Sequence, residues 1–432
     1  MSDKKAHGSR RRMTARRFAD GIVRQFEPKM LHYIQVFCDR LYSSVALHDP
    51  CNQVPWGPAM DMSHWFNYLT FDTMTEYIFG KKSNMLAKRK NQKLMFIFER
   101  LLDFGGILFY LPLPYPEKLN AVLLKLVNQR HDAFSAYITE NPEARRGLPP
   151  DQLPGDVFSH LVTSRDMHSG KMLNHEELQS ECLILSIAGM IKPVFPTHTN
   201  KTHTRLGYDT LSTALAATIF YLSRYQHACT RLSNELQTVF GSIEEIRPGE
   251  KLKACHYLNA SITEALRITP PVTMCLSREV EETGEFIDGQ FLPPGCLVGT
   301  SIYAMHRNAE YFPHPEFYLP ERWLTTSGHF SGPNENKGSP AAVAYNPFSI
   351  GPRACLGKTL ALVELSTIIA RLVWTYEFKP AEGPGGRVGE GNTQARGGRK
   401  DPNEFQLYDR ITTRMEGPII QFRPRRCADN MV

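Results

Sequence analysis

The stretch that decides the fold runs from Pro347 to Gly357 and reads PFSIGPRACLG. It places a single cysteine, Cys355, among two glycines and an arginine. Glycine adopts backbone conformations that are closed to other residues, and it lets a flat ligand approach the main chain. Arg353 lies two residues before Cys355, so its guanidinium can point at an anionic group from a bulged loop. A lone cysteine is usually a small buried apolar residue, whereas these neighbours predict a ligand-binding loop.

A long helix is predicted directly after this loop, as far as about Trp374. Its apolar stripe consists of Leu356, Leu360, Val363 and Thr367. The N-terminus of a helix favours a thiolate, and its free backbone N–H groups can hydrogen-bond the sulfur. Such bonds also tune the reduction potential of a metal that the sulfur binds. The loop and the helix together therefore predict that Cys355 is a metal ligand.

The five residues Phe348, Gly351, Arg353, Cys355 and Gly357 resemble the signature of the cytochrome P450 family. The resemblance implies that Cys355 is the axial ligand of a haem b iron and that Arg353 binds a haem propionate. It also implies that Phe348 and Gly357 lie at the cofactor. A proximal thiolate donates electron density to the iron and favours O–O cleavage. The implied enzyme is a haem-thiolate monooxygenase that inserts one oxygen atom from O2 into a small apolar substrate. Its implied partner is NADPH–cytochrome P450 reductase, which supplies electrons from NADPH.

Glu264 and Arg267 share one face of a helix that the proline pair Pro270-Pro271 ends. Pairs at this spacing are common on solvated surfaces. In the family it resembles, however, the Glu-x-x-Arg pair is structural and is joined by an arginine from a Pro-Glu-Arg segment. Arg322 stands in such a segment, which reads PERW. A planar guanidinium suits a buried bidentate network of this kind.

Three further residues are carried over from the resemblance as cofactor contacts. Arg278 stands where relatives often place a second propionate partner, and His7 and Arg11 match a helix that crosses the haem edge. Stretches such as PWGP at 55–58 and WFNYLTFD at 65–72 resemble fungal members of secondary metabolism and detoxification.

Composition and periodicity predict one large, mainly α-helical domain with a small β region, spanning residues 1–432. Of the 432 residues, 42% are hydrophobic and 22% are charged, which fits a globular protein with a large core. Helices are expected over 13–47, 61–80, 116–140, 152–165, 174–188, 209–225 and 227–239. Short strands are expected at Cys275–Val280, Glu285–Ile287, Cys296–Val298, Tyr376–Phe378 and Pro418–Phe422. A coil is expected from Pro313 to Pro347, and a flexible glycine-rich loop over 383–399.

Charge and cysteine usage argue against several classes of partner and of structural site. The net charge of +6 is too mild to indicate nucleic acid. The basic start of the chain is either a solvated helix face or a docking surface for an acidic reductase or a membrane surface. Nine cysteines without a C-x-x-C pair argue against a disulfide framework or a structural zinc site. No apolar run is long enough to span a membrane. Full-length family members sit on the cytosolic face of the endoplasmic reticulum; this chain is expected to lack their anchor, first sheet and first helices, so a cytosolic location stays open.

Residues 190–207 separate two halves of an expected catalytic helix. Oxygen activation needs an acid and an alcohol that deliver protons, which the family supplies as Ala/Gly-Gly-x-Asp/Glu-Thr within one helix. Here Ala188-Gly189 and Asp209-Thr210 are separated by a polar, cationic stretch without periodicity. It contains Pro193 and Pro196, each of which costs about 3 kcal/mol inside a helix. Deleting 190–207 restores Ala-Gly-Tyr-Asp-Thr, so the stretch is predicted to be a non-native insertion from a retained intron; a genuine insertion loop is the alternative.

The resemblance places the substrate against two segments. These are Val272, Thr273 and Met274 after the proline pair, and Ile411, Thr412 and Thr413 near the end of the chain. Two other functions stay open from the sequence. One is a truncated, catalytically inactive haem-binding scaffold, and the other is a haem-thiolate isomerase or dehydratase that needs no reductase.

Overall fold

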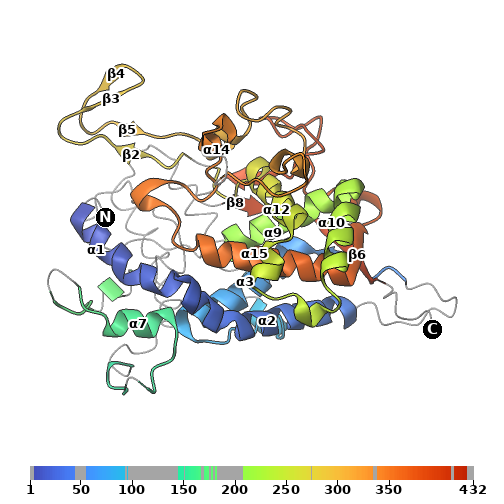
Figure 1. The fold of residues 1–432 in the computed structure, drawn as a ribbon, viewed down its shortest axis with the longest axis horizontal. Helices are drawn as coiled ribbons and strands as arrows, with labels where there is room; N and C mark the ends of the chain where they lie inside the picture. Colours follow the sequence, from blue (N-terminus) through green and yellow to red (C-terminus); the bar gives the residue numbers. More distant parts are fainter. Residues whose placement is uncertain are drawn as a thin grey trace, which may run out of the picture.

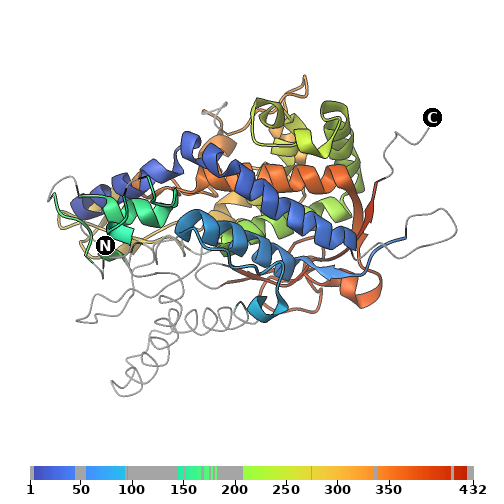
Figure 2. The same ribbon diagram turned by 90° about the horizontal axis from the view of Figure 1, so that it is seen from below.

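Helix α9 (Tyr208–Arg224) lies at the centre of the structure, and every residue from 211 to 223 is buried. A helix that is covered on all sides is typical of the core of a large domain. In the computed structural model α9 packs against α3 (Met62–Phe79), α12 (His256–Ile268) and α15 (Lys358–Thr375). Figures 1 and 2 show α2 (Asp20–Ser43) beside α15 across the body of the molecule. The helix that follows Cys355 is therefore anchored in the core.

Several segments of the chain lie outside the residues that the structure describes. These include the expected helix over 116–140, most of the one over 174–188 and the insertion 190–207. The described residues are 4–43, 55–92, 95, 145–149, 151–166, 170–174, 177, 178, 181, 208–273, 275–333, 338–409 and 413–425.

Helix α3 begins and ends where its sequence predicts. Asp61 caps its start by accepting a hydrogen bond from the backbone N–H of Ser63 at 2.9 Å. Gly80 ends it in the left-handed region with φ of 67°. A Cβ atom on Gly80 would lie 2.5 Å from the Oδ2 atom of Asp156, so this position requires glycine for its space as well as its backbone.

The other expected helices are also present among the described residues. The region expected over 13–47 divides into α1 (Lys4–Ala15), η1 (Arg16–Phe18) and α2 because Ala19 is extended, with ψ of 146°. The coil expected from Pro313 to Pro347 contains two short helices, η3 (Pro320–Trp323) and α14 (Pro340–Ala344). Ser339 caps α14 through the backbone N–H of Ala342. The remaining helical elements are α7 (Val157–Thr163), α10 (Gln226–Val239), η2 (Ile243–Glu245), α11 (Glu250–Lys253), α13 (Ile302–His306), η4 (Gly351–Arg353) and η5 (Gly383–Arg387).

The β region consists of small antiparallel sheets. Strand β9 (Ile419–Pro424) lies between β1 (Met60–Asp61) and β6 (Tyr376–Pro380), and Phe378 pairs with Phe422 in the register. The two-stranded sheets pair β2 (Arg278–Glu279) with β5 (Leu297–Val298), β3 (Glu285–Ile287) with β4 (Gln290–Leu292), and β7 (Leu407–Asp409) with β8 (Thr413–Met415). Figure 1 shows β2 to β5 as one long hairpin that projects from the helical body.

The glycine-rich stretch expected as a flexible surface loop contacts the core helix. It forms η5, and a Cβ on Gly386 would lie 2.0 Å from the carbonyl oxygen of Ala381. Arg224 at the end of α9 donates to the carbonyl of Gly386 at 2.8 Å and to Glu390 Oε1 at 3.1 Å. This guanidinium also lies 3.7 Å from the centre of the Phe220 ring. The glycine-rich stretch therefore packs against the C-terminal end of α9.

The predicted fold class is confirmed: the structure is mainly α-helical with small sheets and forms a single domain. Within the described part of the chain, no helix combines the length and the apolar character needed to cross a membrane.

Candidate functional site

The loop around Cys355 folds back on itself before α15 begins. The backbone N–H of Cys355 donates to the carbonyl of Phe348 at 2.9 Å, and that of Ala354 donates to Gly351 at 3.0 Å. Gly351 turns the chain with φ of 73°, a value that glycine adopts without strain. Gly357 lies against the sulfur, since a Cβ there would be 3.8 Å from Sγ of Cys355. The glycine spacing of the motif is therefore the spacing that closes this loop.

The side chain of Cys355 is exposed, yet the surrounding protein controls its charge. Burial of the sulfur by neighbouring atoms raises the thiol pKa. Hydrogen bonds from the backbone N–H groups of Gly357 and Lys358, together with the charges of Arg11 and Lys358, lower it. Because those donors point at the sulfur, they stabilise it as a thiolate once a cation binds there.

One histidine and three arginines from three elements lie near this loop. His7 on α1 is within electrostatic reach of Arg11 and Arg353, and Arg353 is within reach of Arg278 on β2. Burial lowers the pKa of His7, and the charges of Arg353 and Arg11 lower it further. Burial also lowers the pKa of Arg353, followed by the effect of Arg278. Like charges at close range favour an anionic ligand between them.

The two features together fit a flat, dianionic metal cofactor. The sulfur of Cys355 with its N–H donors would bind the metal, and the glycines leave room beside it. The cationic cluster of Arg11, Arg278 and Arg353, with His7 beside it, would bind the carboxylates. Among the described residues, no three side chains of His, Cys, Asp or Glu come together as a metal site of their own. One thiolate with nearby arginines is a donor set that fits haem.

Glu264 and Arg267 form a fully buried ion pair beneath the loop. The two side chains have 0% exposure, and two guanidinium nitrogens of Arg267 lie 2.8 and 2.9 Å from the two carboxylate oxygens. Arg322 joins them, with Nε 3.3 Å from Glu264 Oε1. The three residues expected as a structural network from the sequence are thus in contact.

Two partners of Glu264 were not expected from the sequence. The indole Nε1 of Trp323 donates to Glu264 Oε2 at 2.8 Å, and the backbone N–H of Leu319 donates to Oε1 at 3.1 Å. Trp323 directly follows Arg322, and a buried Trp needs an acceptor for its N–H, which is the signal that could have identified it.

The acid and the alcohol expected for proton delivery lie in the first turn of α9. Asp209 is buried and Thr210 is half-buried. Ser212 donates to the carbonyl of Asp209 at 3.0 Å and to Oδ1 of Asn67 on α3 at 2.5 Å, which fixes this turn against α3. Gly189, their expected neighbour, lies outside the described residues.

The two segments expected at the substrate lie together over α9. Thr413 donates to the carbonyl of Pro271 at 3.0 Å, and Thr273 donates to Asp409 Oδ1 at 2.8 Å. The hydroxyl of Thr413 also lies 3.5 Å from that of Thr213, one helical turn beyond Thr210. Val272 is half-buried beside them, whereas Met274, Ile411 and Thr412 lie outside the described residues. Thr213 was not expected; its spacing of three from Thr210 places it near the same helix face.

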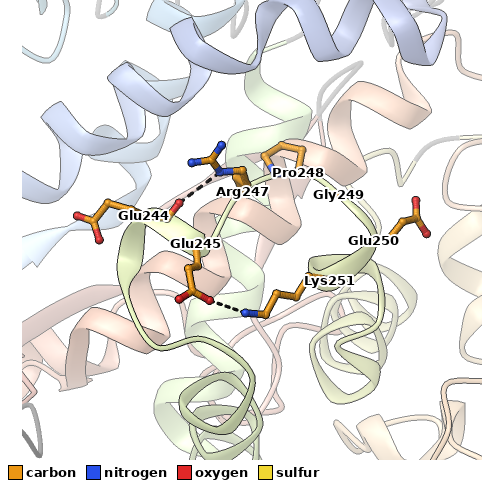
Figure 3. Close-up of a pocket in the computed structure, with 7 residues that line it drawn as sticks. All are labelled: Glu244, Glu245, Arg247, Pro248, Gly249, Glu250 and Lys251. Carbon is orange, nitrogen blue, oxygen red and sulfur yellow. Dashed lines mark hydrogen bonds and ion pairs between the residues drawn. The ribbon is translucent and has the colours of Figure 1, made fainter.

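A surface hollow elsewhere contains none of these residues. It has a volume of about 500 Å³ and lies around the connection between η2 and α11, as Figure 3 shows. In this hollow Lys251 pairs with Glu245, and Arg247 donates to the carbonyl of Glu244 at 3.4 Å. The hollow is separate from the cysteine loop.

Comparisons with known proteins agree on one family. A profile of the family described as Cytochrome P450 matches residues 1–191 and 203–389. A protein named cytochrome P450 monooxygenase from Gibberella zeae is 32% identical over 423 residues, which are 98% of this chain and 90% of that protein. Cytochrome P450 monooxygenase AKT7 from Alternaria alternata is also 32% identical over 423 residues, which cover 98% of this chain and 76% of that protein. The crystal structure of the cytochrome P450DA heme domain matches with a TM-score of 0.69 at 18% identity, over 96% of this chain and 76% of that one, a likeness of fold.

Proposed function

Since this chain belongs to the cytochrome P450 family and is an enzyme of its monooxygenase class, we propose that it inserts one oxygen atom from O2 into a small apolar substrate. The single observation that carries this proposal is the geometry of Cys355. The residue is exposed, and its sulfur receives two backbone N–H groups and lies near the charge of Arg11. With these neighbours Cys355 would bind the iron of haem b as a thiolate.

The proposed cofactor contacts divide into three kinds. Cys355 would bind the iron, and Arg353, Arg278, His7 and Arg11 would bind the propionates. Phe348 and Gly357 would border the macrocycle, because Phe348 closes the loop on Cys355 and Gly357 leaves space beside Sγ. When bound, haem supplies the iron centre at which dioxygen is activated with electrons from NADPH.

The protein's own part in that chemistry would be to deliver protons and exclude water. Asp209 and Thr210 are proposed as the acid and the alcohol, in support of which they lie in one turn that is held against α3. Thr273, Val272 and Thr413 are proposed to border the substrate. They are the described members of two segments that meet over the same helix.

We infer that the stretch 190–207 is an insertion within the family's pattern. In support of this, the family profile resumes at residue 203 after ending at 191, and α9 begins at Tyr208. Removal of the stretch would bring Gly189 next to Tyr208 and complete the Ala-Gly-x-Asp-Thr order.

The proposed partner is an NADPH–cytochrome P450 reductase on the cytosolic face of the endoplasmic reticulum. Arginines that crowd α1 and η1 support an acidic partner, because clustered positive charge steers acidic surfaces toward it. The fungal relatives support a place in fungal secondary metabolism or detoxification.

The test compares the purified holoprotein with Cys355→Ala and with a matched control, Cys296→Ala, on the projecting hairpin. The wild-type and control proteins should give a ferrous carbonyl complex with the red-shifted absorption of thiolate-ligated haem, and Cys355→Ala should not. With reductase, NADPH and labelled O2, the product should carry one labelled oxygen atom. Product formed without reductase would indicate an isomerase or dehydratase instead, and an undiminished complex in Cys355→Ala would refute the ligand assignment.

A further inference from the structure

His306 is a fully buried imidazole that connects the Glu264–Arg267 pair to the cysteine loop. It is the last residue of α13, and its exposure is 0%. Its Nδ1 atom lies 3.0 Å from the carbonyl oxygen of Arg267, and its Nε2 atom lies 3.0 Å from the backbone N–H of Asn346. One ring therefore bonds two segments that are far apart in the sequence.

The two partners fix the protonation state of this ring. A backbone N–H can only donate, so Nε2 carries the lone pair, and a carbonyl can only accept, so Nδ1 carries the proton. Burial lowers the pKa of His306 to about 4. The imidazole is thus neutral and held in one tautomer.

A second hydrogen bond joins His306 and Arg267, with Arg267 as the donor. Nη1 of Arg267 donates to the carbonyl of His306 at 2.8 Å, while the same guanidinium holds Glu264. The ring also stacks on Tyr345, with centroids 5.3 Å apart and an interplanar angle of 10°. Hydrogen bonds and stacking together hold the orientation of the imidazole.

The other bond, to Asn346, leads to the loop that carries Cys355. Asn346 is followed by Pro347 and Phe348, and its carbonyl accepts from the backbone N–H of Ser349 at 3.0 Å. The carbonyl of Phe348 in turn accepts from Cys355 at 2.9 Å. Asn346 is therefore the point at which the loop that carries Cys355 leaves the helical body.

We propose that His306 is a positioning residue for the haem ligand: it holds Asn346 at a fixed place relative to Arg267, and so sets where the sulfur of Cys355 meets the iron. This inference rests on the proposed function, in which Cys355 binds haem. Mutation of a residue that orients a metal ligand without binding the metal itself typically lowers metal affinity about 10- to 100-fold.

Two substitutions separate the two bonds of the ring. His306→Asn places an amide at the Nδ1 position, which can still donate to Arg267, but it leaves the N–H of Asn346 without its acceptor. His306→Gln can place a carbonyl oxygen at the Nε2 position and keep that acceptor. Tyr345→Phe is the matched control, because it removes only the hydroxyl bond to the carbonyl of Thr263, 3.2 Å long, and keeps the stacked ring.

The experiment measures haem dissociation, the absorption of the ferrous carbonyl complex and amide hydrogen exchange over 345–356 in each purified holoprotein. In His306→Asn we expect roughly tenfold faster haem loss, a larger share of complex without the thiolate absorption, and faster exchange. His306→Gln should stay within about twofold of wild type, and Tyr345→Phe should match it.

The inference is overturned if His306→Asn and His306→Gln lose thermal stability to the same extent while haem loss, absorption and loop exchange stay at wild-type values. If His306→Asn does not fold, a folded His306→Gln with a weakened thiolate absorption overturns it as well. Absence of the thiolate absorption from the wild-type protein would instead contradict the proposed function. The wild-type spectrum is measured first, so the two outcomes are distinguished.

Discussion

The Nη2 atom of Arg267 lies 2.8 Å from Oε1 of Glu264, and neither side chain is exposed to solvent. Both charges have lost their water, so the pair depends on the geometry of its hydrogen bonds. Arg267 also donates to the backbone carbonyls of His306 and Phe317. Glu264 accepts further hydrogen bonds from Leu319, Arg322 and Trp323. The network joins α12 to η3 and to the loop that carries Cys355.

Breaking this pair should destabilise the protein strongly. Glu264→Gln leaves the Arg267 charge buried without its counter-charge, which typically costs about 3–5 kcal/mol. We expect that loss in the free energy of unfolding, measured by urea denaturation, together with loss of haem on purification. The matched control is Glu250→Gln, which removes an exposed partner at the same spacing from Lys253 and should leave the curve unchanged. A wild-type curve for Glu264→Gln would show that the network does not hold the fold.

Much of this arrangement could be predicted from the sequence because it is encoded locally. The glycine spacing around Cys355, the three-residue spacing of Glu264 and Arg267, and the cap and stop of α3 at Asp61 and Gly80 all act within a few residues. The same holds for α9, α10 and α15, whose apolar periodicity extends over several turns.

Features that depend on distant partners could not be predicted in this way. The bridge from Arg267 through His306 to Asn346 joins residues about 40 apart, and nothing local distinguishes His306 from any other histidine. Strand β4 is different, because the Asp288-Gly289 pair is a local signal for a hairpin turn that the sequence analysis did not use. Both residues have positive φ in the structure, 49° and 73°.

Glu364 should make the stability of the protein depend on pH. It is buried in α15, its Oε2 atom has no hydrogen-bond partner among the described residues, and burial raises its pKa to about 8. The native state therefore keeps a proton that the unfolded chain releases above its ordinary pKa of 4.5. Stability from this group is fully present below pH 4.5 and is lost progressively as the pH rises toward 8.

The variant Glu364→Gln removes that titration. It should match wild type near pH 4 and exceed its free energy of unfolding near pH 8, by about 1–3 kcal/mol, because an amide pays no penalty for a buried charge. Urea denaturation at the two pH values measures the difference. Equal differences at both pH values would mean that Glu364 does not change its protonation state over this range.

The cationic cluster in front of Cys355 should govern retention of the cofactor. Arg353→Gln or Arg11→Gln removes one of the charges proposed to bind a propionate, and a charge-assisted hydrogen bond is worth about 1.5–3 kcal/mol. We expect haem to transfer to an acceptor protein roughly 10- to 100-fold faster. Arg12→Gln is the control, because Arg12 is on the same helix but exposed. Equal haem-transfer rates in all three variants would contradict the assignment of this cluster to the haem site.

Deleting residues 190–207 should improve the coupling of NADPH consumption to product. In the described structure α9 begins at Tyr208, so Asp209 and Thr210 lie in its first turn, with Tyr208 as the described residue before them on that helix. Joining Gly189 to Tyr208 would place the acid and the alcohol inside a continuous helix, as proton delivery to one point requires. The measurement is product formed per NADPH consumed, with purified reductase, for the deletion variant and the full chain. Sequencing of the mature transcript provides the independent check, since a message that lacks these codons agrees with a retained intron. A deletion variant that folds with haem but couples no better than the full chain would show that the stretch is a tolerated insertion and that Asp209 and Thr210 do not depend on Gly189.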